Sequence, residues 1–248
     1  MITIKTSREI ELLKQSNQIV AKVLKQLKRA IMPGVTTEAL NSLAEDITRR
    51  EGAVPAFKDY HGYPKSLCTS INNTVVHGIP GNVVLKSGDI IGLDYGVKYK
   101  EYFGDSAITV PVGLVTENAR RLIQVTRDAL YAGIRAARAD ACLYDISAAI
   151  QEVVESNGFS VVREFVGHGI GKELHEEPQV PNYGERSKGV KLKDGMVLAI
   201  EPMVNEGDFH VKILEDGWTS VTIDGMLSAH FEHSVAICGN EPLILSEW

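Results

Sequence analysis

An approximate internal repeat constrains the fold of this chain more than any other feature of its sequence. The stretch "TTEALNSLAEDITRREG" and the later stretch "CLYDISAAIQEVVESNG" both have the pattern of an amphipathic helix that ends at a glycine. "LKSGDIIGLD", which ends at Asp94, recurs as "LKDGMVLAIE", which ends at Glu201, 107 residues later (201 − 94). Because these matches keep the same order, they predict two related α/β halves, roughly residues 1–112 and 113–248, that face each other.

The repeat places acidic residues at equivalent strand ends of the two halves. Asp94 and Glu201 each follow an apolar, strand-like run, and the loosely related "FGDSAITV" and "FEHSVAIC" add Asp105 and Glu232. Four carboxylates that converged on the pseudo-symmetry axis would repel one another, and burial would raise their pKa values. Two divalent cations would neutralise four negative charges. The pattern therefore predicts a metal centre between the halves.

Each residue taken alone also has an ordinary structural interpretation. A strand-end aspartate commonly belongs to a turn or a cap, and Glu201 precedes Pro202 and fits a loop. The stretch "FVGHGIGKELHEEP" offers His168 and His175 as further ligands, but "GHGIGK" does not match a phosphate-binding P-loop, and the chain has no HExxH motif. The metal-centre interpretation depends on the combination of these residues with the repeat.

Helical periodicity predicts long helices at the start of each half. Residues 7–30 carry apolar side chains at helical spacing, with Ser7 as the expected cap and Pro33-Gly34 as the end. Residues 117–138 show a similar pattern. Lysines and an arginine near the start (Lys22, Lys25, Lys28 and Arg29) are interpreted as a solvated helix face.

Charge and cysteine content narrow the class of protein. The net charge of −6 gives no general reason to expect a nucleic acid or an anionic membrane as ligand. The three cysteines are far apart and form no CxxC pair, which is typical of a reducing cytoplasm rather than a disulfide framework. No apolar run approaches the ~18 residues of a membrane helix. We therefore expect a cytoplasmic protein without a membrane partner.

Six motifs occur in a characteristic order: "VVHGIP", "LDYG", "FGDSA", "GHGIGKELHEEP", "LAIEPMV" and "HFEHSV". In this order and spacing they resemble the type I methionine aminopeptidases of bacteria, over essentially the whole chain. The resemblance implies a single catalytic domain over residues 1–248 with the pita-bread fold, an α/β (α+β) architecture of two pseudo-symmetric halves around a central antiparallel sheet. It implies a hydrolase, a metalloprotease that removes the initiator methionine from nascent chains with a small second residue. It also implies a monomer that contacts the ribosome transiently and binds no specific nucleic acid.

The resemblance assigns two divalent metal ions, Co²⁺, Mn²⁺, Fe²⁺ or Zn²⁺, to five ligands. Asp105 and Glu232 would bridge both ions, Asp94 would hold one, and His168 with Glu201 would hold the other. The family's general base also matches Glu201.

Two further histidines and an apolar pocket complete the site that the resemblance implies. His175 would donate to the developing oxyanion, and His77 would contact the scissile amide. The substrate's methionine side chain would lie among Tyr60, Tyr63, Cys68 and Trp218.

Three positions depart from a common bacterial pattern of this family. Phe57 stands where Cys is frequent and Leu174 where Phe is frequent, which puts the depth of the methionine pocket in question. Tyr95 replaces a small or β-branched residue beside Asp94, and we expect it to shift the metal preference.

Two alternatives remain at this point. A proline-specific aminopeptidase or prolidase usually carries an additional amino-terminal domain, whereas this chain starts directly with the first expected helix. A non-catalytic pita-bread protein that binds RNA, ribosomes or partner proteins would lose metal ligands, whereas all five positions are filled here.

Overall fold

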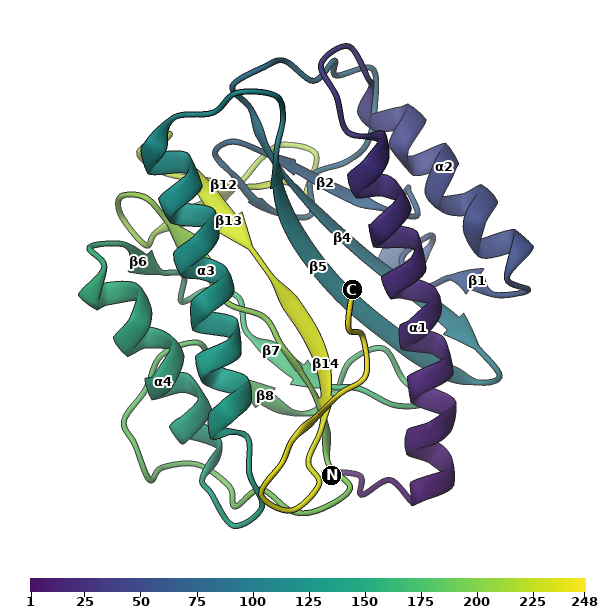
Figure 1. Ribbon diagram of the computed structural model, residues 1–248, viewed down its shortest axis with the longest axis vertical. Helices are drawn as coiled ribbons and strands as arrows, with labels where there is room; N and C mark the ends of the chain where they lie inside the picture. Colours follow the sequence, from purple (N-terminus) through teal and green to yellow (C-terminus); the bar gives the residue numbers. More distant parts are fainter.

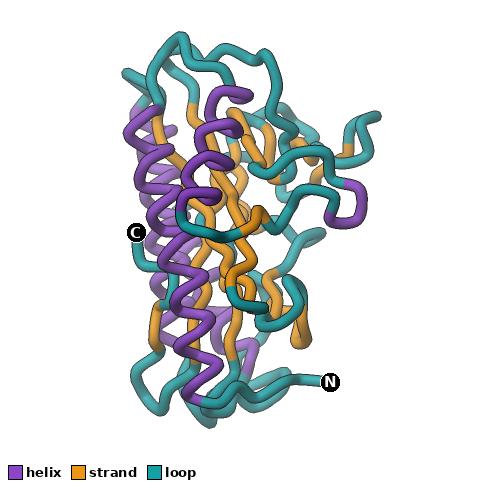
Figure 2. Tube along the Cα trace, turned by 90° about the vertical axis from the view of Figure 1, so that its right-hand side faces the viewer, coloured by secondary structure: helices purple, strands orange, loops and turns teal.

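The computed structural model describes residues 1–248 as a twisted sheet with its helices packed on one face (Figures 1 and 2). The four α-helices form two pairs, one pair from each half of the repeat. They are α1 (Ser7–Ala30), α2 (Thr37–Arg50), α3 (Glu117–Ala136) and α4 (Leu143–Ser156). None of the helices combines the length and the apolar character that crossing a membrane would require.

Local capping explains where the helices begin. The Thr6 hydroxyl accepts a hydrogen bond from the Glu9 backbone N–H, and the Glu9 carboxylate accepts one from the Thr6 N–H. This reciprocal pair is a capping box, so Thr6 caps α1 and the expectation for Ser7 is wrong by one position. Thr36 and Thr116 cap α2 and α3 through the hydroxyl alone, which accepts a hydrogen bond from the backbone N–H of Ala39 and of Ala119. Helix α3 ends at Ala136, two residues before the expected end.

The main sheet joins the two halves of the chain. The first half of the chain contributes three of the seven strands that follow one another across this sheet, and the second half contributes the other four. In spatial order these strands are β1 (Val54–Pro55), β4 (Ile90–Tyr99), β5 (Tyr102–Pro111), β14 (Glu232–Ala236), β9 (Val197–Ile200), β7 (Gly167–Gly169) and β8 (Glu176–Val180). Every pairing between them is antiparallel. The halves meet where β5 pairs with β14, which confirms the antiparallel sheet and the two-half arrangement that the sequence predicts.

Shorter strands extend this framework. Two of them pair with the main sheet: β2 (Cys68–Ile71) with β4, and β15 (Leu243–Ile244) with β14. Two three-stranded sheets are formed by β6 (Ser160–Val161), β10 (Met203–Asn205) and β13 (Ser228–His230), and by β3 (Thr74–Val76), β11 (Val211–Ile213) and β12 (Ser220–Thr222). The single-turn helix η1 (Tyr60–Gly62) lies among loops on the face opposite the α-helices (Figure 2).

The apolar core lies between the helices and the sheet, and it fixes the orientation of β4. Tyr95 is fully buried in this core, and its hydroxyl lies 2.6 Å from the hydroxyl of Thr48 in α2. Successive residues of a strand point to opposite faces. Asp94 therefore points to the face away from the helices, where the loops surround it.

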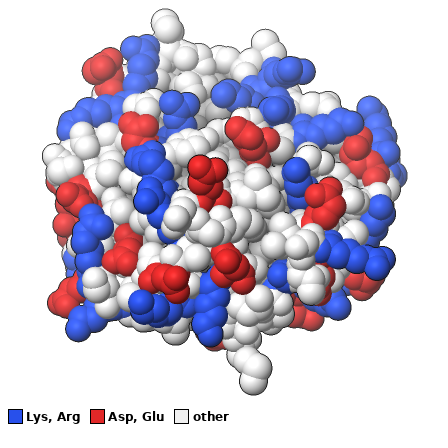
Figure 3. Space-filling view, turned by 60° about the horizontal axis from the view of Figure 1, so that its bottom comes forward, with Lys and Arg blue, Asp and Glu red and all other residues white.

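Charged side chains of both signs are interspersed on the surface. On the face drawn in Figure 3, lysines and arginines lie among aspartates and glutamates without a large area of one sign. This mixture agrees with the small net charge of −6.

Candidate metal centre

Three carboxylates converge where the two halves meet. Ala107 of β5 is the register partner of Asp94 in β4 on one side and of Glu232 in β14 on the other. Asp105 precedes Ala107 by two residues on the same strand, so its side chain points to the same face. Asp105 and Glu232 are 3% and 2% exposed. The small side chain of Ala107 leaves room for all three acidic groups to approach each other.

His168 and Glu201 reach the same place from the second half. His168 in β7 pairs with Ala199 in β9, and Glu201 follows that strand. The His168 Nε2 atom lies 3.5 Å from Glu201 Oε1. The five residues that the resemblance assigns to the metals therefore lie together on the face opposite the helices.

The glycines on either side of His168 permit this packing. A Cβ atom at Gly167 would clash with the carbonyl oxygen of Ala199, and one at Gly169 would clash with the carbonyl oxygen of Glu177. Strand β7 lies between β8 and β9, so its backbone contacts a neighbour on each side. The sequence "GHG" thus presents one imidazole from a strand whose two flanking positions have no room for a side chain.

Several carboxylate oxygens of the cluster have no hydrogen-bond partner and are available to bind divalent cations. Asp94 Oδ1, Asp105 Oδ1 and Glu232 Oε1 are buried without any hydrogen-bond partner. Buried polar atoms are normally satisfied, so a group of orphaned oxygens requires an explanation such as a bound ion. Donor atoms of Asp105, His168 and Glu232 lie within 4.8 Å of one another. Carboxylate oxygens with an imidazole suit first-row divalent metals.

Burial and mutual repulsion oppose ionisation of these carboxyl groups in the absence of a cation. Burial raises the pKa of Asp94 to about 7 and the pKa of Glu201 to about 8. The pKa values of Asp105 and Glu232 are raised well above their ordinary range by burial and by the neighbouring carboxylates. Burial lowers the pKa of His168 to about 3, so this imidazole is neutral and able to bind a metal.

A small cavity of about 70 Å³ opens beside the carboxylates. Its walls combine apolar side chains with Asp94 and two of the predicted histidines. The lining residues are Phe57, Tyr63, Cys68, His77, Asp94, Leu174, His175 and Trp218. The structure therefore brings together three of the four residues assigned to the methionine pocket, and both departures at Phe57 and Leu174 form part of the wall.

Tyr60, the fourth of these residues, lies at the edge of the cavity. Its hydroxyl is 2.9 Å from Nδ1 of His175. The ring of His175 is also 4.3 Å from the ring of His168, in an edge-to-face arrangement. His175 thus stands between the metal-ligand cluster and Tyr60.

The loop that carries His175 is held by the next residue. Glu176 Oε2 forms a 2.6 Å ion pair with Nζ of Lys5, and both side chains are largely buried. Glu176 Oε1 accepts a hydrogen bond from the backbone N–H of Lys172. These contacts fix the loop and thereby the position of His175.

His77 has an unusual backbone conformation. Its φ of 61° lies in the left-handed region, which residues other than glycine adopt rarely, in turns and at functional sites. The ring packs edge-on against Phe165 and Trp218. Burial lowers the pKa of His77 to about 4, so its imidazole is neutral at pH 7.

Two residues of the site were not recognised from the sequence. His230 is buried, and its Nε2 atom lies 3.5 Å from Glu201 Oε2. It stands in the motif "HFEHSV" two residues before Glu232, and the alternation of strand residues was the signal that would have identified it. Asn182 donates a 3.0 Å hydrogen bond to the Glu201 carbonyl oxygen, and nothing in the sequence near Asn182 indicates this contact.

No contact between Tyr95 and the carboxylate cluster supports the expectation that Tyr95 shifts the metal preference. Its side chain points into the helix layer and bonds Thr48, so it does not face the carboxylate cluster. Its bulk instead fills the core between β4 and α2.

Comparison with known proteins agrees with this site. The model of metallopeptidase family M24 matches residues 11–238. A methionine aminopeptidase of Clostridium perfringens is 50% identical over 99% of both chains, and methionine aminopeptidase 1 of Bacillus subtilis is 51% identical over 96% of both. The crystal structure of a methionine aminopeptidase from Thermotoga maritima superposes with a TM-score of 0.98 at 46% identity, covering all of both chains. The chain therefore has the pita-bread fold and belongs to metallopeptidase family M24, within the group of the methionine aminopeptidases.

Proposed function

We propose that this chain is a metalloaminopeptidase that removes the initiator methionine from proteins whose second residue is small, with two divalent metal ions bound by Asp94, Asp105, His168, Glu201 and Glu232. The observation that carries this proposal is the set of orphaned buried oxygens of Asp94, Asp105 and Glu232 beside a small, mostly apolar cavity. Relatives at about half identity over the full chain are methionine aminopeptidases, which supports the choice of substrate.

The ions would supply two-metal hydrolytic chemistry, in which a water molecule is acidified and the scissile carbonyl is polarised. Asp105 and Glu232 are the most buried of the four carboxylates and lie on the two central strands, which supports their assignment as the bridging ligands. Asp94 approaches from β4, and His168 with Glu201 approach from the opposite side.

Glu201 is the general base in this proposal. Its carboxylate lies between two imidazoles, with His168 at 3.5 Å from one oxygen and His230 at 3.5 Å from the other. Without a cation, burial raises the pKa of Glu201 to about 8, and bound cations would favour the ionised carboxylate that a general base requires.

His175 and His77 bind and polarise the substrate. The ring of His175 lies beside the ring of His168, so an N–H of His175 can donate to negative charge that develops on the scissile carbonyl oxygen. Nδ1 of His175 faces the Tyr60 hydroxyl, which fixes the ring orientation. His77 lines the same cavity as Asp94 and is positioned to contact the scissile amide.

The cavity supplies the pocket for methionine. Tyr63 and Trp218 pack edge-to-face with their ring centres 5.1 Å apart, and Cys68 lies on strand β2 beside Asp94 of β4. A flexible, unbranched thioether side chain fits such an irregular apolar space. The metal cluster at one side would bind the free α-amine, which restricts the reaction to the terminal residue.

The protein acts as one catalytic domain over residues 1–248 in this proposal, and as a monomer. All five proposed ligands and the lining of the cavity belong to this chain, so the proposed site needs no residue from a second copy. Its substrates are nascent chains, so we place its action in the cytoplasm, with a transient encounter at the ribosome.

Substrate preference separates this function from that of a proline-specific relative. We expect release of free methionine from Met-Gly-Met-Met and from peptides that begin Met-Ala or Met-Ser, slow release from peptides that begin Met-Leu or Met-Lys, and no release with a metal chelator present. Faster cleavage of X-Pro peptides than of Met-Gly-Met-Met would assign the chain to the proline-specific function instead. No cleavage of either class with added metal would indicate a non-catalytic protein.

A further inference from the structure

His230 is a buried histidine whose ring nitrogen lacks a partner. The residue is 3% exposed, and its Nε2 atom makes no hydrogen bond. The nearest carboxylate oxygen, Glu201 Oε2, lies 3.5 Å away, beyond normal hydrogen-bond distance. Burying an unpaired polar nitrogen is costly, so this atom requires a partner such as a bound ion or a water molecule.

His233, three residues after His230, is a buried histidine whose ring nitrogen has a hydrogen-bond partner. Nδ1 of His233 lies 2.9 Å from the Ser246 hydroxyl, and its ring stacks on Trp248 with the ring centres 4.5 Å apart. His233 faces the helix layer and has no carboxylate beside it. His230 differs from it in every one of these respects.

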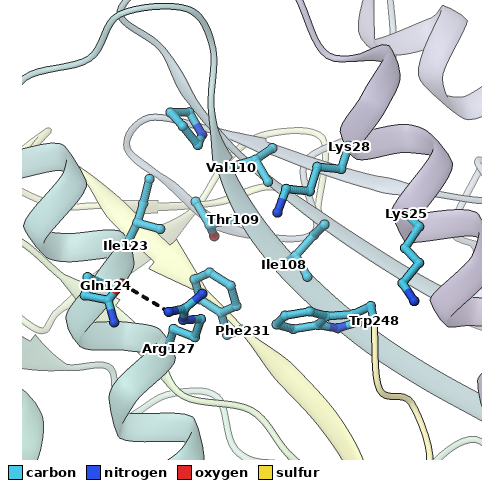
Figure 4. Close-up of a pocket in the computed structure, with 11 residues that line it drawn as sticks. Lys25, Lys28, Ile108, Thr109, Val110, Ile123, Gln124, Arg127, Phe231 and Trp248 are labelled. Atoms are coloured by element: carbon cyan, nitrogen blue, oxygen red, sulfur yellow. Dashed lines mark hydrogen bonds between the residues drawn. The ribbon is translucent and has the colours of Figure 1, made fainter.

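The backbone at His230 is fixed by a contact from the neighbouring half. Thr109 of β5 accepts a 2.9 Å hydrogen bond from the His230 N–H and donates a 2.8 Å hydrogen bond to the His230 carbonyl oxygen. Thr109 and Phe231 line a cavity of about 290 Å³ between α1 and α3, on the helix face of the sheet (Figure 4). Because Phe231 points to that face, His230 and Glu232 on either side of it point to the metal cluster.

Donor atoms of His230, Glu201 and Glu232 lie within 4.8 Å of one another. This group is separate from the group of Asp105, His168 and Glu232, and the two share only Glu232. Each group contains one imidazole. Glu201 lies between the two imidazoles, 3.5 Å from His168 and 3.5 Å from His230, so both nitrogens can reach an ion that Glu201 would hold.

We propose that Nε2 of His230 is a sixth ligand of the metal centre and gives it a second imidazole, on the side of Glu201 and Glu232. A site with two imidazoles has a greater preference for Fe²⁺, Co²⁺ or Zn²⁺ over Mn²⁺ or Mg²⁺ than a site with one. Thr109 is the positioning residue that holds His230 in place. This inference rests on the proposed dinuclear function and deepens it by naming a ligand that determines metal selectivity.

The test counts coordinated imidazoles and measures metal affinity. Pulsed electron paramagnetic resonance of the Mn²⁺-loaded full chain detects nitrogen atoms bound to the metal. Titration calorimetry with Co²⁺ and with Mn²⁺ gives the affinity for each ion. The variants are His230→Gln, which keeps an amide able to hydrogen-bond Glu201, and His168→Gln. The matched control is His210→Gln, because His210 is an exposed histidine bonded to Asp208, away from the cluster.

We expect two coordinated imidazoles in the native protein and in His210→Gln, and one in His230→Gln. Loss of an outer-shell partner of a metal ligand costs about 10–100-fold in affinity. Loss of a direct ligand should cost no less, so the Co²⁺ affinity of one site should fall by that factor or more in His230→Gln. The Mn²⁺ affinity should fall less. Thr109→Val should lower the Co²⁺ affinity in the same direction by a smaller factor.

One coordinated imidazole in the native protein would overturn the proposal, and this measurement needs no variant to fold. The same conclusion would follow if His230→Gln weakened metal binding but left the nitrogen count unchanged, because the side chain would then act only by hydrogen bonding. If His168→Gln left both the nitrogen count and the affinity unchanged, the proposed metal centre itself would be wrong.

Discussion

The hydroxyl of Ser106 donates a 2.6 Å hydrogen bond to the carbonyl oxygen of Glu232, and so ties strand β5 of the first half to strand β14 of the second. A second bond crosses the same junction, from the Ser234 hydroxyl to the Asp105 carbonyl oxygen at 2.9 Å. Both bonds attach to the backbone of a proposed bridging ligand. The distance between Asp105 and Glu232 is therefore set by the junction of the two halves.

Replacing Ser106 with alanine should loosen this junction. The buried Glu232 carbonyl would lose the bond, so we expect the free energy of unfolding to fall by about 1–3 kcal/mol and metal affinity to fall with it. Urea unfolding and calorimetric metal titration measure the two effects. Ser156→Ala is the matched control, since Ser156 makes a similar bond to the Val153 carbonyl at an exposed helix end. Equal losses in both variants would show that the junction has no special role.

Alanine variants of the two histidines in "GHGIGKELHEEP" should lose activity for different reasons, one through metal affinity and the other through kcat. His168→Ala removes a proposed ligand, so metal affinity should fall and excess metal should restore part of the activity. His175→Ala should bind metal almost normally, yet lose kcat by roughly 10²–10³, the usual cost of removing an oxyanion donor. Calorimetry and steady-state kinetics with excess Mn²⁺ or Co²⁺ test both variants. If His175→Ala lost the metal and His168→Ala kept it, the two roles would be reversed.

The glycine before His168 should tolerate no side chain. A Cβ atom at Gly167 would meet the Ala199 carbonyl oxygen, so Gly167→Ala must push β7 away from β9. We expect a loss of about 1–3 kcal/mol in the free energy of unfolding, typical of overpacking, together with weaker metal binding because His168 moves. Gly81→Ala is the control, because a Cβ atom there meets nothing within 4 Å. Comparable stability of the two variants in urea would contradict the packing argument.

Removal of metal should make stability depend on pH. Burial raises the pKa of Asp94 from 3.8 to about 7 and the pKa of Glu201 from 4.5 to about 8. Above about pH 6.5 the buried histidines are largely neutral in both states, so there the folded metal-free protein holds more protons than the unfolded chain. Its free energy of unfolding should therefore fall as pH rises from about 6.5 to about 8. Metal affinity should rise over the same interval, because the ligands must lose protons to bind.

Urea unfolding in the presence of a chelator, at about pH 6.5 and about pH 8, measures this dependence. Asp94→Asn removes one of the titrating groups, so the fall in stability should be smaller in this variant than in the native chain. An identical fall in both would show that Asp94 does not titrate as described.

The repeat made much of the fold predictable from the sequence. The recurring motifs that end at Asp94 and Glu201 predicted the two halves, and the structure joins them through β5 and β14. The expectation that Asp94 and Asp105 end their strands is wrong, because β4 continues to Tyr99 and β5 to Pro111. Local patterns also gave the helices to within a few residues, although the capping box at Thr6 was missed because Ser7 beside it is an equally good cap in isolation.

The parts that could not be predicted depend on contacts between distant segments. Strand alternation places His230 on the same face as Glu232, but its contacts with Thr109 and Glu201 require the folded sheet. The position of Tyr95 directly after Asp94 in sequence predicts an effect on the metal preference. Strand alternation and the partner Thr48 place it on the other face.

The claim that the carboxylate cluster binds two catalytic metal ions is tested most directly by titrating the metal-stripped protein with Co²⁺ or Mn²⁺ while free methionine is measured from Met-Gly-Met-Met. The account predicts no release without metal, recovery of activity on addition, a total of two bound ions per chain by calorimetry, and loss of both binding and activity in Glu232→Gln. Full activity of the stripped protein, or a Glu232→Gln variant that binds two ions and releases methionine at the native rate, would contradict it.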